Sequence, residues 1–133
     1  MTTRAELVTA LVSALTPIVG AGRVHARKFP QVTSGAPPSW PAIRYTGVDT
    51  TPTADICGGG REEEADVRLQ IDVASDSALG ESAHLARVRA VRLALSALGP
   101  EWVWDSERDL PDDFDKKTTA TSLDFVVYLS SPD

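Results

Sequence analysis

Seven consecutive residues of the chain alternate strictly between apolar and polar side chains. The segment VRLQIDV, residues 67–73, keeps this period of two without exception, and successive side chains of a β-strand point to opposite faces of its sheet. One face of this strand meets a core, and the other, with Arg68, Gln70 and Asp72, meets solvent or a partner. The chain must therefore cover one face of a sheet with a second layer.

Two amphipathic helices are available for that layer. The first begins at Thr3, because Thr3 and Glu6 form a capping box, and its apolar stripe ends before Gly20. The second follows the turn at residues 75–77 and ends at Gly99. Its small apolar residues are expected to face the sheet and permit a close approach. They are Leu79, Ala83, Ala86, Ala90, Leu93, Ala94 and Ala97.

Four other segments are predicted to be strands: residues 23–27, 41–49, 101–105 and 123–129. The last is apolar on both faces over part of its length, which favours a central place in the sheet. Residues 50–64 and 106–120 are expected to be connections. The order predicts one α+β domain over residues 1–133, with a mostly antiparallel sheet of about four or five strands packed against two main helices.

Charge and cysteine content exclude several classes of protein. The chain has 13 basic and 19 acidic residues, a net charge of −6, which argues against a protein that grips phosphate backbones. Cys57 is the single cysteine, so neither an intrachain disulfide nor a paired-cysteine zinc site is possible. No apolar run approaches the ~20 residues of a membrane-spanning helix.

The glycine run at residues 58–60 raises the question of a phosphate-binding loop. Such a loop needs a following helix, whereas here Glu62, Glu63 and Glu64 and then a strand follow. The run is therefore interpreted as a turn before a strand. The acidic segment at residues 105–115 lacks the spacing of a calcium loop and is interpreted as solvated. No cofactor and no metal are expected.

Catalytic motifs are absent from the sequence. His25 and His84 are isolated, no serine lies in a nucleophile motif, and both histidines are interpreted as structural. The arginines at 87, 89 and 92 favour a solvated or intersubunit face over a phosphate-binding one. Trp102 and Trp104 share one strand face, as core residues or as anchors of a protein interface. The protein is not expected to be an enzyme.

The succession of segments resembles the small tail completion or tail terminator proteins of long-tailed bacteriophages. The likeness covers nearly the whole chain and rests on GRVHARKFP, PAIRYTGVD, VRLQIDVAS, LARVRAVRLAL and LDFVVYLS. It implies a non-enzymatic virion protein, assembled in the bacterial host cytoplasm. The protein would form a ring, typically a hexamer, at the head-proximal end of the tail tube, where it ends tube growth and joins the tail to the head neck.

The implied partners are other copies of the chain, the tail tube protein and a head neck or connector protein. Genomic DNA would cross the ring without sequence-specific binding, and no membrane is involved. Contacts are expected in three loops, residues 31–39, 58–64 and 109–115, and on the polar face of the alternating strand. The candidate assembly-interface residues are Gln31, Trp40, Gly58, Gly59, Glu62, Glu63, Glu64, Arg68, Asp72, Asp112 and Asp113.

Three alternatives remain open at this point. The first is another neck or minor tail protein, such as a head-side connector. The second is a cellular α+β module that binds a small ligand. The third is a small hydrolase that uses His25 or His84 with partners brought together by the fold.

Overall fold

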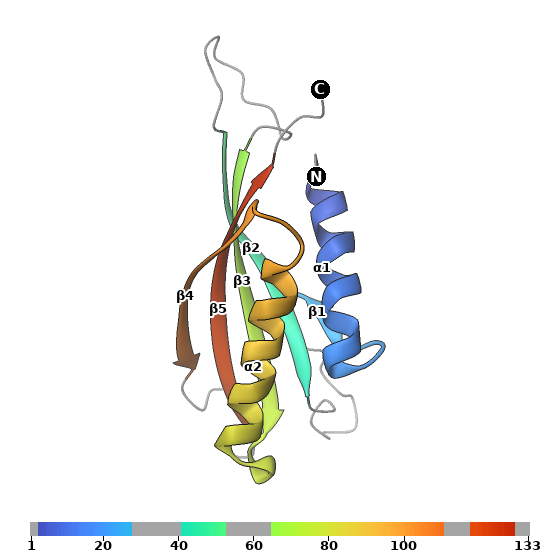
Figure 1. Cartoon of the computed structure of the whole chain (residues 1–133), viewed down its shortest axis with the longest axis vertical. Helices are drawn as coiled ribbons and strands as arrows, with labels where there is room; N and C mark the ends of the chain where they lie inside the picture. The colour runs from blue at the N-terminus through green and yellow to red at the C-terminus, as the bar shows by residue number, and fades with distance from the viewer. Residues whose placement is uncertain (1–2, 28–40, 53–64, 111–117, 130–133) are drawn as a thin grey trace.

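The computed structural model describes residues 3–27, 41–52, 65–110 and 118–129, and these form two α-helices, a 3-10 turn and five strands. The strands form one sheet in the order β1-β2-β3-β5-β4, with β1 parallel to β2 and the other pairs antiparallel. Both helices lie on one face of this sheet (Figure 1). The α+β prediction is confirmed. The elements are α1 (Arg4–Val19), β1 (Val24–Ala26), β2 (Ala42–Pro52), β3 (Ala65–Asp76), η1 (Ser77–Leu79), α2 (Glu81–Ser96), β4 (Trp102–Leu110) and β5 (Thr118–Leu129).

Helix α1 begins and ends where the sequence predicts. The Thr3 hydroxyl accepts a hydrogen bond of 3.2 Å from the backbone N–H of Glu6, as an N-cap should. Gly20 ends the helix with a φ of 102°, a backbone conformation that residues with a side chain rarely adopt. The buried residues of the helix are Leu7, Leu11, Leu15 and Val19.

Helix α2 turns a different face to the sheet from the one that its alanines predict. Leu79, just before the helix, and Leu93 are 58% and 52% exposed, and Ala83 and Ala86 are also exposed. Branched side chains bury more apolar area than alanines, so the helix packs through a narrower stripe. The stripe consists of His84, Val88, Val91 and Leu95. The expectation that the alanine-rich side approaches the sheet is wrong.

Strands β3 and β5 form the centre of the sheet. They pair over their full length, from Ala65 opposite Leu129 to Asp76 opposite Thr118. The predicted apolar face of residues 67–73 is buried, and β5 lies between β3 and β4, which confirms its interior place. The residues of β3 and β5 that build the core are Val67, Leu69, Ile71, Val73, Leu123, Phe125, Val127 and Leu129.

The strands are longer than their sequence patterns suggest. β2 continues to Pro52, β4 to Leu110, and β5 begins at Thr118, so residues expected in connections belong to the sheet. Residues 103–109 of β4 are all exposed. Beyond Trp102 this edge strand buries no face, so it has no hydrophobic alternation there, and cross-strand hydrogen bonds hold it in place.

Candidate functional site

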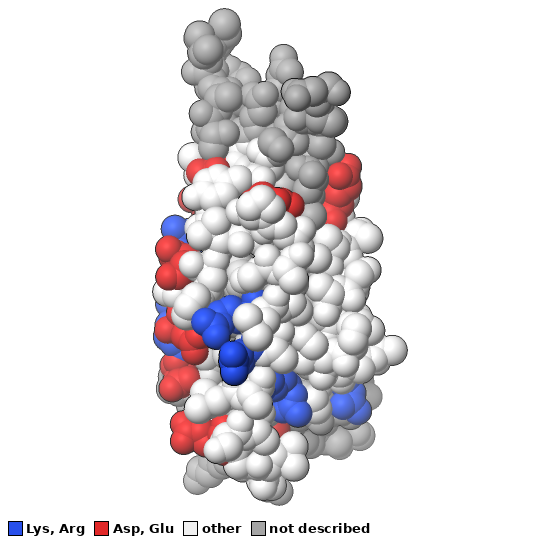
Figure 2. Space-filling view, in the orientation of Figure 1, with Lys and Arg blue, Asp and Glu red and all other residues white. Residues whose placement is uncertain are grey.

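Charged side chains are unevenly distributed over the surface. Figure 2 shows the face covered by the helices, where a broad area is uncharged and acidic atoms follow the margin occupied by β4 in Figure 1. The exposed large apolar residues of α2 are Leu85 and Leu93. Figure 2 also shows basic atoms over the middle of this face, so the uncharged area is one part of it, and such an area is suited to contact with other proteins.

The opposite face of the sheet holds a buried ion pair. Arg44 Nε donates to the Asp72 carboxylate over 2.5 Å, and Gln70 donates to the same carboxylate over 3.1 Å. The Asp72 side chain is 1% exposed. The alternating pattern predicted that Asp72 meets solvent or a partner, and this expectation is wrong, because two neighbouring side chains neutralise and enclose the carboxylate.

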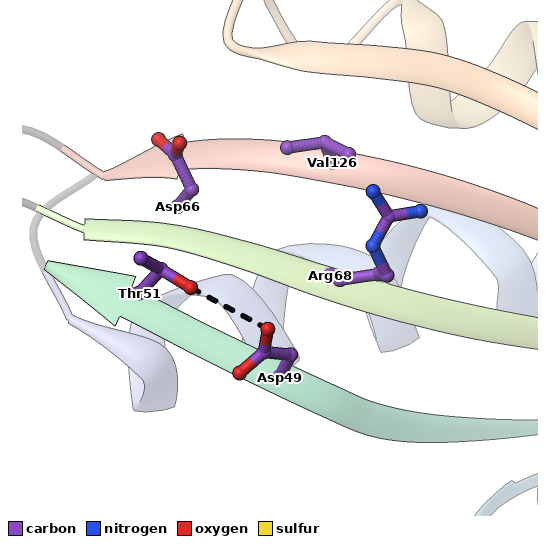
Figure 3. Close-up of a pocket in the computed structure, with 5 residues that line it drawn as sticks. All are labelled: Asp49, Thr51, Asp66, Arg68 and Val126. Atoms are coloured by element: carbon purple, nitrogen blue, oxygen red, sulfur yellow. Dashed lines mark hydrogen bonds between the residues drawn. The ribbon is translucent and has the colours of Figure 1, made fainter. Parts of the chain in front are cut away.

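Arg68, in contrast, lies on the surface as predicted. Its side chain extends from β3 toward β5 (Figure 3), and its Nη1 donates over 3.0 Å to Asp105 of β4. The two side chains are 45% and 47% exposed. An exposed pair of this kind contributes less than about 1 kcal/mol. Arg68 can therefore change partners at little cost, which keeps it a candidate for intermolecular contact.

A small cavity opens beside Arg68, where β2, β3 and β5 run side by side (Figure 3). Its volume is about 170 Å³. Ligand pockets in proteins measure about 300–1,000 Å³, so this cavity accommodates a single side chain rather than a cofactor. The lining residues are Asp49, Thr51, Asp66, Arg68 and Val126.

A chain of hydrogen bonds, buried at His84 and part-buried at its two ends, ties α2 to the sheet. His84 Nδ1 lies 2.8 Å from the Ser75 hydroxyl, and His84 Nε2 lies 2.9 Å from the Thr121 hydroxyl. Arg87 donates to Ser75 over 2.7 Å, and Thr121 donates to Asp109 over 3.0 Å. Because Asp109 accepts the Thr121 proton, Nε2 of His84 must carry a hydrogen, and Nδ1 accepts the Ser75 proton.

The environment of His84 keeps the imidazole neutral. Burial lowers its pKa below 6.5, the neighbouring positive charge of Arg87 lowers it further, and Asp109 and Glu81 oppose this to a smaller extent. Ser75 is 0% and His84 is 2% exposed. The network thus resembles a catalytic relay in its order of groups, but His84, Ser75 and Thr121 are enclosed in packed structure, and the network holds α2 on the sheet.

The two tryptophans of β4 have different environments. Trp102 is 3% exposed and meets Phe125 edge to face, with ring centroids 6.5 Å apart. Trp104 is 40% exposed, and the Arg92 guanidinium lies 4.4 Å from its ring centroid. The core interpretation is confirmed for Trp102, and for Trp104, exposed beside a cation, the interface interpretation stays a prediction.

Most candidate interface residues lie outside the described part of the chain. These are Gln31, Trp40, Gly58, Gly59, Glu62, Glu63, Glu64, Asp112 and Asp113. Within residues 3–27, 41–52, 65–110 and 118–129, no three His, Cys, Asp or Glu side chains are grouped to hold a metal ion. The same residues contain no helix of the length and apolar character needed to cross a membrane.

Sequence reasoning missed Ser75 and Thr121 as partners of His84. Three separate elements bring them together, and neither residue lies in a local motif. The only hint in the sequence is a histidine among apolar residues of an amphipathic helix, since a buried imidazole requires hydrogen-bond partners.

Comparison with known proteins decides the class. A family model described as "Tail completion protein gp17" matches residues 5–130. The chain belongs to this tail completion family. No curated protein matches it.

Membership in the tail completion family confirms the resemblance noted in the sequence and gives the protein a structural role in the phage tail. For a structural tail protein, the relevant sites are surfaces that contact other virion proteins. In the described residues, the candidates for such surfaces are the uncharged part of the helical face and the exposed Arg68–Asp105 pair, and both stay predictions.

Proposed function

We propose that the protein forms a ring at the head-proximal end of the tail tube, where it terminates tube assembly and joins the tail to the head neck. The match of the tail completion family to residues 5–130 carries this proposal. The ring is a hexamer of identical subunits, and its other partners are the tail tube protein and a neck or connector protein. Each subunit contacts its neighbour through two different patches, as closed cyclic rings require.

The charge of the chain supports a position around a DNA channel. At a net charge of −6, the protein has few basic groups with which to hold the phosphate backbone, so DNA passes without being retained. The packed network around His84 and the long β3–β5 ladder provide a rigid body. A rigid subunit is suited to a ring whose dimensions must match those of a tube.

Electron microscopy of phage particles that lack the chain tests the proposal. We expect unjoined heads and tails of irregular length, because nothing caps the growing tube. Supplying the wild-type chain from a plasmid should restore particles of uniform length. The empty plasmid is the control and should restore neither joined particles nor uniform length.

The same experiment distinguishes the proposed tail terminator from its rival, a head-side connector. Tails of uniform length together with heads that have lost their DNA would assign the chain to the head side of the neck. Normal, infectious virions without the chain would remove it from both roles.

A further inference from the structure

The two edges of the sheet carry charges of opposite sign. The edge strand β4 has the acidic residues Asp105, Glu107 and Asp109 and the single basic residue Arg108. The opposite edge strand, β1, is flanked by Arg23 and Arg27. In Figure 2 the acidic atoms follow the margin of β4, and the basic atoms lie over the middle of the face and toward the lower right, beside the end of α1 that leads into β1.

These two edges also lie at the same height along the strands. His25 of β1 is opposite Arg44, Arg44 is opposite Asp72, Asp72 is opposite Ser122, and Ser122 is opposite Arg108. The middle of β1 is therefore level with the segment from Glu107 to Asp109 across the sheet. In a closed ring, the two contacting patches of each subunit must lie at one height along the ring axis. The described edges meet this condition when the strands run along that axis.

The backbones of both edges are oriented for such a contact. Arg23 and Arg27 bond to β2 through their own backbones, at 2.9 Å to Ile43 and 2.8 Å to Tyr45. Since alternate residues of a strand direct their backbone groups to opposite sides, those of Val24 and Ala26 point away from β2. Among the described strands, only β5 pairs with β4, so no described strand occupies the outer side of β4.

We propose that the acidic β4 edge of one subunit docks against the basic β1 edge of the next subunit. The inference rests on the proposed ring and identifies its subunit contact. β1 and β4 run in opposite directions in the sheet, so the docked strands are antiparallel. A contact between two β4 edges would bring like charges together, whereas the head-to-tail contact pairs carboxylates with guanidinium groups.

A charge swap tests this contact. Glu107→Lys and Arg27→Glu each reverse an exposed charge on one edge, and each should lower the association constant of purified subunits at least ~10-fold. The double variant should recover most of the loss, because the pair is restored with reversed polarity. Arg89→Glu, an exposed reversal on α2 away from both edges, is the comparison and should lower association less than either edge reversal.

Association is measured by analytical ultracentrifugation and by electron microscopy of rings at low salt, and circular dichroism checks the fold of each variant. The same variants are then tested for restoration of joined tails in phage that lack the chain. Should the subunits form rings only on the tail end, this second assay gives the charge-swap result.

The outcomes separate the contact from the function. Loss of subunit association in either single variant, together with its recovery in the double variant, supports the contact between the proposed edges. Rings or joined tails that withstand both single reversals would overturn the contact while leaving the terminator role intact. Single variants that form rings but fail to join tails would assign these edges to another virion protein. Tails of normal length in phage lacking the chain would contradict the proposed function itself.

Discussion

The Ser75 hydroxyl of β3 donates its proton to Nδ1 of His84 in α2 over a distance of 2.8 Å. This bond requires an imidazole without a hydrogen on Nδ1, and the remaining ring nitrogen donates to Thr121. Protonation of His84 would place two donors on the ring and eliminate the bond that Ser75 now donates. The attachment of α2 to the sheet is therefore sensitive to the charge of one buried side chain.

The first prediction concerns the stability of the protein in mild acid. Burial lowers the pKa of His84 below 6.5, and burial also lowers that of His25. The unfolded chain then takes up protons at a higher pH than the folded chain. The free energy of unfolding should have its full value above about pH 6.5. It should decrease as the pH falls below that value toward the pKa of the histidines in the folded protein.

Urea denaturation at about pH 7.5 and about pH 5 measures this effect, in a range where most carboxylates stay ionised. His84→Gln keeps a donor near Thr121 but does not titrate, so its stability should depend less on pH than that of the wild type, whatever its starting value. An equal pH dependence in both proteins would mean that His84 is not the sensitive group.

The second prediction concerns the ion pair between Arg44 and Asp72. Arg44→Met leaves a carboxylate that is 1% exposed without its cation and should cost about 3 kcal/mol. The double variant Arg44→Met/Asp72→Leu should be less destabilised than the sum of the single changes. Arg68→Met, in the exposed pair with Asp105, is the control and should cost less than about 1 kcal/mol. Equal costs for Arg44→Met and Arg68→Met would contradict the prediction.

The third prediction tests which side of α2 packs on the sheet. Leu95 is 0% exposed, and Leu95→Ala should lower the free energy of unfolding by about 3 kcal/mol because it removes buried area and leaves a cavity. Leu93→Ala, two residues earlier on the exposed side, should change it by no more than about 0.5 kcal/mol. Chemical denaturation of both variants provides the comparison. If Leu93→Ala is the more damaging change, the helix packs through its alanine-rich side after all.

The fourth prediction concerns the start of α1. Thr3→Ala removes the hydroxyl that accepts the Glu6 N–H and should cost about 1 kcal/mol. Thr9 donates to the backbone of Ala5 from the exposed side of the same helix, so Thr9→Ala serves as the control and should have the smaller effect. Thermal unfolding of both variants, followed by circular dichroism, measures the difference. Similar melting temperatures for Thr3→Ala and the wild type would show that the cap contributes little.

The sequence predicted the positions of helices and strands better than the burial and hydrogen-bond partners of individual side chains. The cap at Thr3, the strict alternation of residues 67–73 and the interior position of β5 all depend on local patterns, and all are confirmed. The buried side of α2 and the burial of Asp72 were predicted incorrectly. These features depend on which neighbours supply hydrogen bonds, such as Ser75 for His84 and Arg44 for Asp72, and those neighbours are distant in the sequence.

The extent of β4 illustrates the same limit. The run from Asp105 to Asp109 is acidic and exposed, so its composition resembles that of a solvated loop. Pairing with β5 determines its conformation, for example Glu107 opposite Leu123. Hydrophobic patterns reveal strand residues that bury a face, and they give no signal for the part of an edge strand whose residues are exposed.

The place of β5 in the sheet has a consequence for the synthesis of the protein. The central strand β3 pairs along its whole length with β5, and its Ala65 meets Leu129. A ribosome therefore releases the helices, β1, β2, β3 and β4 before the strand that joins β3 to β4 is available. The β3–β5 and β5–β4 pairs can form only after residue 129 has left the exit tunnel, so part of the apolar face of β3 stays uncovered until the end of the sheet has been synthesised.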